Sequence, residues 1–194
     1  MPNHYNIPFK TDKASLRYYT YFELLLSKIK ILKHLGKFKA GRAVIIKKNV
    51  DIRITENGTL NVDDHTVFDI DSQLVLTKPK PAIKIGKNVL IGKGTLIYCK
   101  NKIEIGSNTR IGAYTTIRDH IHKNVSKKNT VIKSDSFIKQ VSIGNDVWVG
   151  NYCTIFPGVK IGNGAIIATY SLVDSDVRSG TLVAGQPARF IKKI

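Results

Sequence analysis

Histidine is the residue type in this sequence best suited to acid–base chemistry, because imidazole gains and loses a proton near neutral pH. Two of the five histidines, His120 and His122, follow Asp119 in a polar segment. The other three are scattered along the first third of the chain: His4, His34 and His65. An imidazole beside a carboxylate can do acid–base chemistry when the carboxylate orients it, and forming a turn is the alternative role for Asp119. In an extended segment the two histidines share a face, so their spacing does not separate them.

Cysteine content and charge narrow the chemistry further. The two cysteines, Cys99 and Cys153, have no zinc-ligand spacing and form no disulfide framework, which favours a reducing compartment. Lys and Arg number 31 against 14 Asp and Glu, a net charge of +17, so we expect an anionic partner. No nucleic-acid-binding motif is visible, so we expect that partner not to be nucleic acid. Without a secretory signal or an apolar run of 18 residues, we expect a cytoplasmic protein.

Residues 1–40 are predicted to form an arm and an amphipathic, basic helix. The helix is expected over 12–35, with Asp12 as its N-cap and Gly36 ending it. Eleven basic and two acidic residues fall within positions 1–50, which gives this quarter +9 of the net charge. Clustered lysines suit peripheral contact with an anionic membrane surface, and simple packing on the end of the domain is the alternative.

From about residue 41 the aliphatic residues recur with a period of six. The in-register residues are Ile85, Ile91, Ile97 and Ile103, then Ile105, Ile111 and Ile117, then Ile143, Val149, Ile155, Ile161, Ile167 and Val173. Three such hexads make a coil of about 18 residues with three short strands, and stacked coils share one core. We therefore predict an all-β solenoid, a parallel β-helix of hexapeptide repeats. An earlier stretch, 46–76, is a degraded version of the pattern.

One interruption of the repeat predicts a protruding loop. Ile117 and Ile143 are 26 positions apart, which is not a multiple of six. We place the β-helix at 41–185, a loop at about 118–142 and a basic tail at 186–194. Function concentrates on loops held by a rigid scaffold, and this loop carries the paired histidines.

Three segments of the second half carry a family resemblance: 141–150, 155–165 and 183–189. Together they closely resemble the hexapeptide-repeat acyltransferases, in the branch containing galactoside, maltose and polysaccharide O-acetyltransferases. The resemblance covers roughly residues 41–194. It implies a left-handed β-helix, a homotrimer, acetyl-CoA bound in the cleft between neighbouring prisms, and a histidine of an extended loop as general base.

Polysaccharide-modifying members of this branch often have Asp, two variable residues and then His. Asp119 and His122 match that pattern, so the resemblance implies His122 as the base, with His120 as the alternative. Acetyl transfer to a hydroxyl needs such a base and a backbone N–H that meets the developing oxyanion. Direct transfer needs no covalent enzyme intermediate, because proximity of the two bound substrates supplies much of the rate.

The resemblance also implies that Trp148, Gly150, Asn151 and Thr169 contact acetyl-CoA. Relatives often have Thr-Lys near the position of Asp174-Ser175, and in its place we expect the basic tail residues Arg189 and Lys192 to contact the co-substrate. Trp148 matches an aromatic that walls the cleft, and the backbone N–H of Asn151 faces the thioester oxygen in relatives. Arg189 and Lys192 suit the phosphates of the co-substrate. Zinc enzymes of similar fold spread three histidines over successive coils, whereas the coils after residue 143 contain none, so we expect no metal.

The favoured function is an acetyl-CoA-dependent O-acetyltransferase acting on a sugar hydroxyl of a surface-glycan precursor or a glycoside. The acceptor would be a small molecule or a lipid-linked sugar. One alternative keeps the chemistry and makes the acceptor an amine of a nucleotide-linked amino sugar. The other is a non-catalytic β-helix scaffold, against which the paired histidines and the segment around Trp148 argue.

Overall fold

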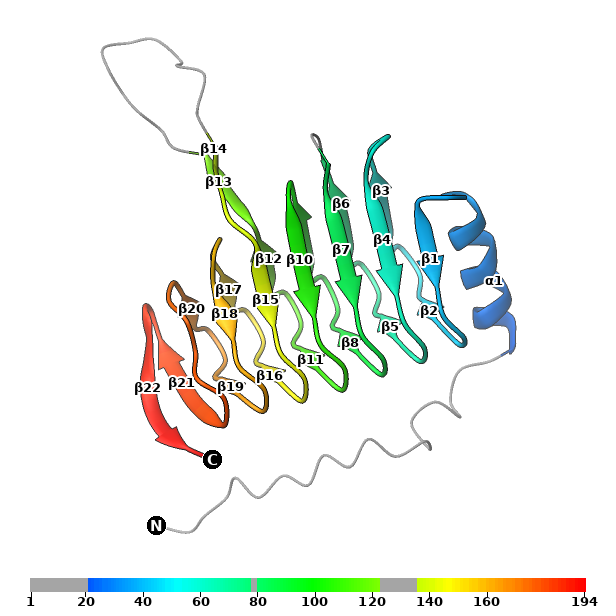
Figure 1. Cartoon of the computed structure of the whole chain (residues 1–194). Coiled ribbons are helices and arrows are strands. Elements are labelled where there is room, and N and C mark those ends of the chain that lie inside the picture. The colour runs from blue at the N-terminus through cyan, green and yellow to red at the C-terminus, as the bar shows by residue number, and fades with distance from the viewer. Residues whose placement is uncertain (1–20, 78–79, 123–135) are drawn as a thin grey trace.

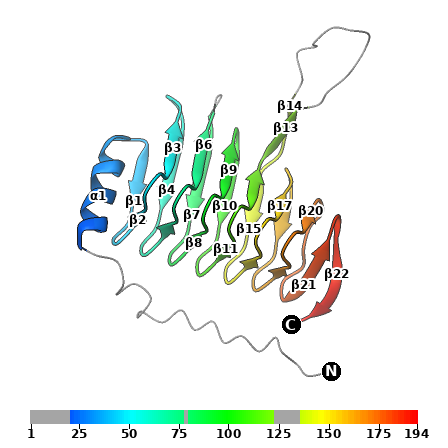
Figure 2. The same cartoon turned by 180° about the vertical axis from the view of Figure 1, so that it is seen from behind.

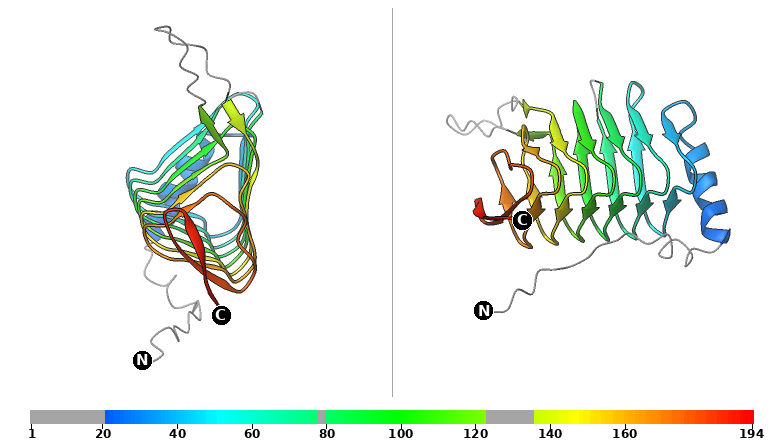
Figure 3. Two further views of the ribbon diagram at one scale, coloured as in Figure 1. Left: turned by 90° about the vertical axis from the view of Figure 1, so that its left-hand side faces the viewer. Right: turned by 60° about the horizontal axis from the view of Figure 1, so that its bottom comes forward.

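The computed structural model describes residues 21–77, 80–122 and 136–194. These residues form the left-handed parallel β-helix of hexapeptide type that the sequence predicts. Each coil contributes one short strand to each of three sheets, which we name A, B and C in chain order (Figure 1). Viewed along its axis, the prism is a stack of coils around one apolar core (Figure 3).

The strands alternate regularly among the three sheets. Sheet A contains β1 (Phe38–Ala40), β4 (Thr59–Val62), β7 (Ala82–Ile85), β10 (Lys102–Ile105), β15 (Val141–Ile143) and β18 (Lys160–Ile161). Sheet B contains β2 (Ile45–Ile46), β5 (Val67–Phe68), β8 (Leu90–Ile91), β11 (Arg110–Ile111), β16 (Trp148–Val149), β19 (Ile166–Ile167), β21 (Thr181–Gly185) and β22 (Ala188–Lys193). Sheet C contains β3 (Asp51–Ile54), β6 (Gln73–Leu76), β9 (Leu96–Cys99), β12 (Thr116–Arg118), β17 (Thr154–Ile155) and β20 (Leu172–Val173).

Two pairs of strands depart from the parallel arrangement. The predicted basic tail contains β22, which folds back antiparallel on β21 at the last coil. The predicted loop begins with β13 (His120–His122) and ends with β14 (Ser136–Ile138), which pair antiparallel. Figures 1 and 2 show β13 and β14 projecting from the side of the prism, and we call these two strands the arm.

The six-residue period is confirmed by the register of the strands. Ile97 lies opposite Ile117, which lies opposite Ile155, which lies opposite Val173. All four side chains are at most 1 % exposed, so each hexad sends one aliphatic residue into the prism. Burial of this continuous apolar column is the main source of stability for a solenoid, whose coils cannot bury their apolar faces alone.

All extra residues of the repeat fall at one corner of the prism. Val149 pairs with Ile167, 18 positions on, which is the length of an uninterrupted coil. Along sheet B the earlier pairs are 22, 23, 20 and 38 positions apart: Ile46 with Phe68, Phe68 with Ile91, Ile91 with Ile111, and Ile111 with Val149. Within a coil the hexads stay intact, as in Val62, Phe68 and Leu74. The insertions therefore lie between a strand of sheet C and the next strand of sheet A.

Helix α1 (Tyr21–Leu32) closes one end of the prism and packs against β2 (Figure 1). Its predicted N-terminal part, including the Asp12 cap, lies outside the described residues. The helix ends at Leu32 rather than at the expected Leu35, because the next residues form a tighter turn. In that turn the carbonyl of His34 accepts the N–H groups of Lys37 and Phe38, and Gly36 has a φ of 79°.

Candidate active site

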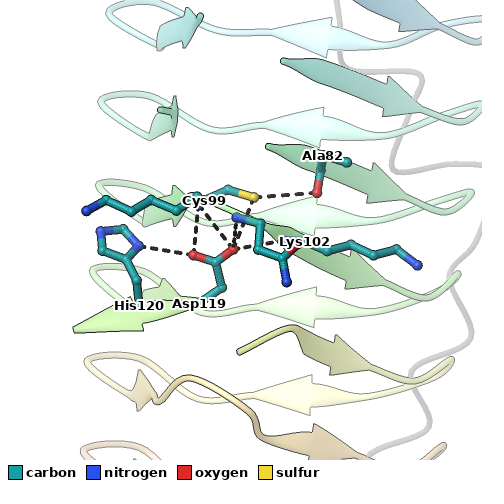
Figure 4. A network of polar contacts seen from close by, with 7 residues as sticks. Ala82, Cys99, Lys102, Asp119 and His120 are labelled. Carbon is teal, nitrogen blue, oxygen red and sulfur yellow. Dashed lines mark hydrogen bonds and ion pairs between the residues drawn. The ribbon is translucent and has the colours of Figure 1, made fainter. Parts of the chain in front are cut away.

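The site is built around Asp119, whose side chain is fully buried directly after β12. Three backbone N–H groups of the preceding coil donate to its carboxylate (Figure 4): Lys100 to Oδ1 at 2.8 Å, Asn101 to Oδ2 at 2.6 Å and Lys102 to Oδ2 at 2.9 Å. These donors converge because the coil has two extra residues at this corner, which turn the chain around the carboxylate. A buried carboxylate needs such compensation, and backbone donors supply it.

His120 is the side chain that this carboxylate orients. Its Nδ1 lies 3.0 Å from Oδ1 of Asp119, and its side chain is 13 % exposed. Because a carboxylate can only accept, Nδ1 carries a proton in this contact. An imidazole that a carboxylate orients through Nδ1 can act as a general base at Nε2 when the ring is neutral.

His122 occupies the same strand as His120, but its side chain lies outside the described part of the chain. Its assignment as the base stays a prediction, as does the alternative at His120. The spacing from Asp119 favours His122, whereas the contact with the buried carboxylate favours His120. Asp119 both accepts from the backbone of a turn and contacts the imidazole of His120, and its role in catalysis stays a prediction.

Cys99 completes the polar cluster as a neutral thiol. Its Sγ lies 3.4 Å from Oδ2 of Asp119 and 3.5 Å from the carbonyl oxygen of Ala82 (Figure 4). Burial raises the pKa of the Cys99 thiol far above its usual range, and the neighbouring carboxylate raises it further. A thiol held in its protonated form donates hydrogen bonds and is a poor nucleophile, so Cys99 supports Asp119 rather than the chemistry.

A pocket of about 470 Å³ lies beside His120. It is lined by Tyr98, Arg118, His120 and Ile121. Tyr98 and Arg118 lie opposite each other on β9 and β12, immediately before the corner from which the arm projects. Sequence reasoning missed both, because an Arg or Tyr at the end of a strand has no distinctive spacing.

A second, larger hollow lies over sheet B and contains two of the predicted cofactor residues. Trp148 and Asn151 line this groove of about 710 Å³, together with Lys93 and Arg110. The Asn151 side chain accepts the N–H of Ala113 at 2.8 Å, so its position is fixed by the preceding coil. We call this hollow the sheet B groove.

The remaining predicted cofactor residues lie in two places. Gly150 and Thr169 lie at the corner that follows sheet B, and Arg189 and Lys192 lie on β22. A Cβ on Gly150 would come within 2.5 Å of the Thr169 nitrogen, so Gly150 lets successive coils approach closely there. Arg189 on β22 forms an ion pair with Asp174 at 3.3 Å, and Lys192 lies exposed on the same strand. Arg189 therefore has a protein carboxylate as partner, which a phosphate would have to replace or share.

Three tyrosines form a stack beside the sheet B groove. The ring centroids of Tyr114 and Tyr152 are 5.3 Å apart, and those of Tyr152 and Tyr170 are 4.9 Å apart. All three have φ between 56° and 62° at the same corner of successive coils. Ala113 and Asn151, which precede Tyr114 and Tyr152 in the chain, line the groove. The tyrosine stack therefore runs along the rim of the groove.

The structure does not bring the two predicted halves of the site together within one chain. Asp119 and His120 lie at the corner between sheets C and A, whereas Trp148 belongs to sheet B. In a three-sided prism that corner is opposite sheet B. His120 and the sheet B groove of a single chain therefore face different directions.

Among the described residues, no helix is both long and apolar enough to cross a bilayer. Over the same ranges, no group of three or more His, Cys, Asp or Glu side chains is arranged to hold a metal ion.

Comparisons with known proteins agree with the architecture. The bacterial transferase hexapeptide (six repeats) model matches residues 140–175, and the hexapeptide repeat of succinyl-transferase matches 82–117. The chain is 30% identical over 151 residues to "Putative lipopolysaccharide biosynthesis O-acetyl transferase WbbJ" of Escherichia coli K12, covering 72% of this chain and 74% of that protein. It is 37% identical over 111 residues to "Putative acetyltransferase YvoF" of Bacillus subtilis, covering 56% of this chain and only 59% of YvoF.

A solved structure with the same fold is a mutant of AntD, an N-acyltransferase from Bacillus cereus. That crystal structure contains dTDP-4-amino-4,6-dideoxyglucose and coenzyme A. It superposes with a TM-score of 0.73 over 85% of this chain and 88% of that chain. At 23% sequence identity this likeness establishes a shared fold.

Proposed function

Because the chain belongs to the hexapeptide-repeat acetyltransferase family, we propose that it is an acetyl-CoA-dependent O-acetyltransferase acting on a sugar hydroxyl. The observation that carries this proposal is the buried Asp119 carboxylate, which orients His120 beside an open pocket. The buried carboxylate would also hold its turn in a scaffold protein, but a scaffold has no need of an oriented imidazole beside an open pocket.

In this mechanism His120 is the general base. Its Nε2 takes the proton of the acceptor hydroxyl as that oxygen attacks the acetyl carbonyl carbon. Asp119 stabilises the imidazolium that forms, through the hydrogen bond at Nδ1. The imidazolium then returns the proton to the departing thiolate, so the products are the acetyl ester and free coenzyme A. The backbone N–H of Asn151 is the proposed oxyanion donor.

The site is proposed to form between neighbouring copies in a homotrimer. The separation of His120 from the sheet B groove supports this, since a neighbour can bring the corner of one prism against sheet B of the next. Trp148, Gly150, Asn151 and Thr169 of one copy would then hold acetyl-CoA beside the histidine of another. Arg189 and Lys192 are the proposed contacts for its phosphates, and each is exposed at the last coil.

The proposed acceptor is a sugar of a surface-glycan precursor, either small or lipid-linked, and the name of the relative WbbJ supports this choice. A second candidate is N-acylation of a nucleotide-linked amino sugar. The specific observation in its favour is the amino-sugar nucleotide bound by AntD. Both candidates use the same base, because either acceptor must lose a proton to form the acyl product.

Acetyl-CoA turnover, followed by thiol release, tests the proposal with sugars, glycan precursors and nucleotide-linked amino sugars as acceptors. Wild type should be compared with His120→Ala and His122→Ala. We expect turnover to fall by about 10²–10⁴ in His120→Ala and by much less in His122→Ala. Loss in His122→Ala alone would move the base to position 122. If wild type neither binds acetyl-CoA nor consumes it with any acceptor, the enzyme proposal fails.

A further inference from the structure

Arg118 is placed to act on whatever enters the pocket beside His120. It is the last residue of β12, and the preceding Ile117 points into the prism with 0 % exposure. Alternation along the strand therefore sends Arg118 outward, where it lines the pocket with Tyr98 and His120. The guanidinium and the proposed base thus share one hollow of about 470 Å³.

The guanidinium of Arg118 has a buried donor without an acceptor. Its Nε is buried and has no hydrogen-bond partner among the described residues. The nearby carboxylate of Asp119 is already bonded by backbone N–H groups and His120. In contrast, three other arginines contact an aspartate within 3.3 Å: Arg42, Arg53 and Arg189. A buried donor left unsatisfied is costly, and a bound acceptor atom would remove that cost.

We propose that this pocket is the acceptor subsite and that Arg118 binds an anionic group of the acceptor sugar, a carboxylate or a phosphate. This inference rests on the proposed function and defines its substrate class. The planar fork of Arg matches both groups, and Tyr98 provides a wall for the sugar ring. The volume suits one sugar unit. A neutral sugar offers Nε only a hydroxyl oxygen, whose hydrogen bond is weaker than the charge-assisted bond to a carboxylate or phosphate.

Binding of three probes to the whole protein tests this assignment: glucuronic acid, glucose 6-phosphate and glucose, each titrated by calorimetry. The first two distinguish a carboxylate from a phosphate. We expect at least one acidic sugar to bind wild type about tenfold or more tightly than glucose, and Arg118→Gln to lose that preference. The matched control is Arg53→Gln, which removes one positive charge from the same outward face of sheet C and should behave as wild type.

Several results would overturn the assignment. They are equal binding of acidic and neutral sugars, unchanged binding by Arg118→Gln, a loss of coenzyme A affinity in that variant, or a change in its assembled mass. The last two would make Arg118 a cofactor or subunit contact. The binding readout needs no turnover, so failure of the proposed function is recognised separately: acidic sugars bind through Arg118, yet acetyl-CoA is not consumed.

A separate observation concerns helix α1, whose apolar stripe faces away from the prism. Leu25, Leu26, Ile29 and Leu32 are between 39 % and 61 % exposed. The inward face combines Ile31, which packs against the core, with polar contacts: the Ser27 hydroxyl accepts the N–H of Ile46, and the Lys30 ammonium donates to the Ile46 and Lys47 carbonyls. These four exposed side chains therefore contribute little to holding the helix on the fold.

The positive charge around this apolar stripe indicates that its partner is anionic. Lys28 and Lys33 lie exposed on its two sides, and residues 24–50 contain eight Lys and Arg and no Asp or Glu. We infer that α1 rests on an anionic membrane surface, with the leucines entering the headgroup region and the lysines meeting lipid phosphates. The helix lies across the end of the prism, so the β-helix would stand end-on to the bilayer (Figure 1).

Sedimentation with vesicles of phosphatidylglycerol or phosphatidylcholine tests this second inference. We expect binding to the anionic vesicles only, with a decrease of about tenfold or more in both Leu25→Ser/Ile29→Ser and Lys28→Glu/Lys33→Glu. The control is Lys84→Glu/Lys160→Glu, which makes the same charge change on sheet A. Unchanged binding in the α1 variants would overturn the inference. So would a change in assembled mass, which would show that a second copy covers the stripe.

Discussion

Replacement of Asp119 by Asn should reverse the tautomer of His120 and thereby remove the base. The variant keeps the shape of the side chain but has one acceptor oxygen in place of two. That oxygen will stay at the position of Oδ2, where Asn101 and Lys102 donate. The amide nitrogen then replaces Oδ1 and donates to Nδ1 of His120, 3.0 Å away. The imidazole proton moves to Nε2, which can no longer accept one.

The size of both effects follows from the contacts. Three backbone donors lose a charged acceptor, at about 1 kcal/mol each, and the Lys100 N–H now faces an amide N–H, which adds about 1–2 kcal/mol. We therefore expect the free energy of unfolding to fall by about 4–5 kcal/mol, since the site is fully buried and poorly screened. Loss of the base should lower kcat by about 10²–10⁴.

Denaturant unfolding and acetyl-CoA turnover measure the two effects separately, with turnover assayed where Asp119→Asn is fully folded. His120→Ala is the matched control, because it removes the base but leaves the backbone donors paired with the carboxylate. It should lose turnover with little loss of stability. Turnover of folded Asp119→Asn within a few-fold of wild type would refute the orienting role. Wild-type stability of that variant would refute the role of the carboxylate in holding the turn.

Three further predictions address the assembly, the coils and the thiols. Co-expression of His120→Ala with Trp148→Ala should restore activity at about a quarter of the sites, because mixed trimers place an intact histidine against an intact groove. Gly106→Ala should lower the free energy of unfolding by about 2–3 kcal/mol, measured by denaturant, because its Cβ would lie 2.5 Å from backbone atoms of the next coil. Cys99 and Cys153 should resist a thiol reagent at pH 8 until the protein unfolds, because burial raises the pKa of both.

Each of these has its own control and contrary result. Absence of restored activity in the mixed trimers would place the whole site within one chain. Gly164→Asn is the control for the glycine, because its φ of 65° suits Asn and no atom lies within 4 Å of its Cβ position. If Gly106→Ala has the same free energy of unfolding as wild type, the prediction is wrong, because successive coils could then move apart with little loss of stability. Rapid labelling of the folded protein would show that one of the thiols is accessible.

The coils could be predicted from the sequence because each hexad is a local pattern. An aliphatic residue every six positions is read without knowing which strands pair. The first coils seemed degraded because insertions shift the register between coils, although Val62, Phe68 and Leu74 keep the spacing within one coil. Phe68 is fully buried and was missed for this reason. Counting hexads within a coil, instead of across insertions, would have found it.

The surroundings of Asp119 could not be predicted, because they depend on contacts between coils. Its donors, Lys100 to Lys102, lie 17 to 19 positions earlier in the chain. No local pattern indicates that their N–H groups converge on one carboxylate. The orientation of α1 is a similar case. Helical spacing of its leucines predicted an amphipathic helix correctly, but that spacing does not reveal whether the apolar face points inward or outward.

The position of the insertions gives a physical reason for the division of labour in the proposed site. Every extra residue between coils falls at the corner of sheets C and A, so this corner can change length without disturbing the buried hexads. The chain cannot change length in this way next to sheet B, because each strand of that sheet lies between two intact hexads. A rigid face suits a co-substrate that is the same in every turnover, whereas a corner of variable length suits selection of the acceptor. Arg118, Asp119 and His120 all lie at that corner, which is where we expect changes of acceptor specificity to arise.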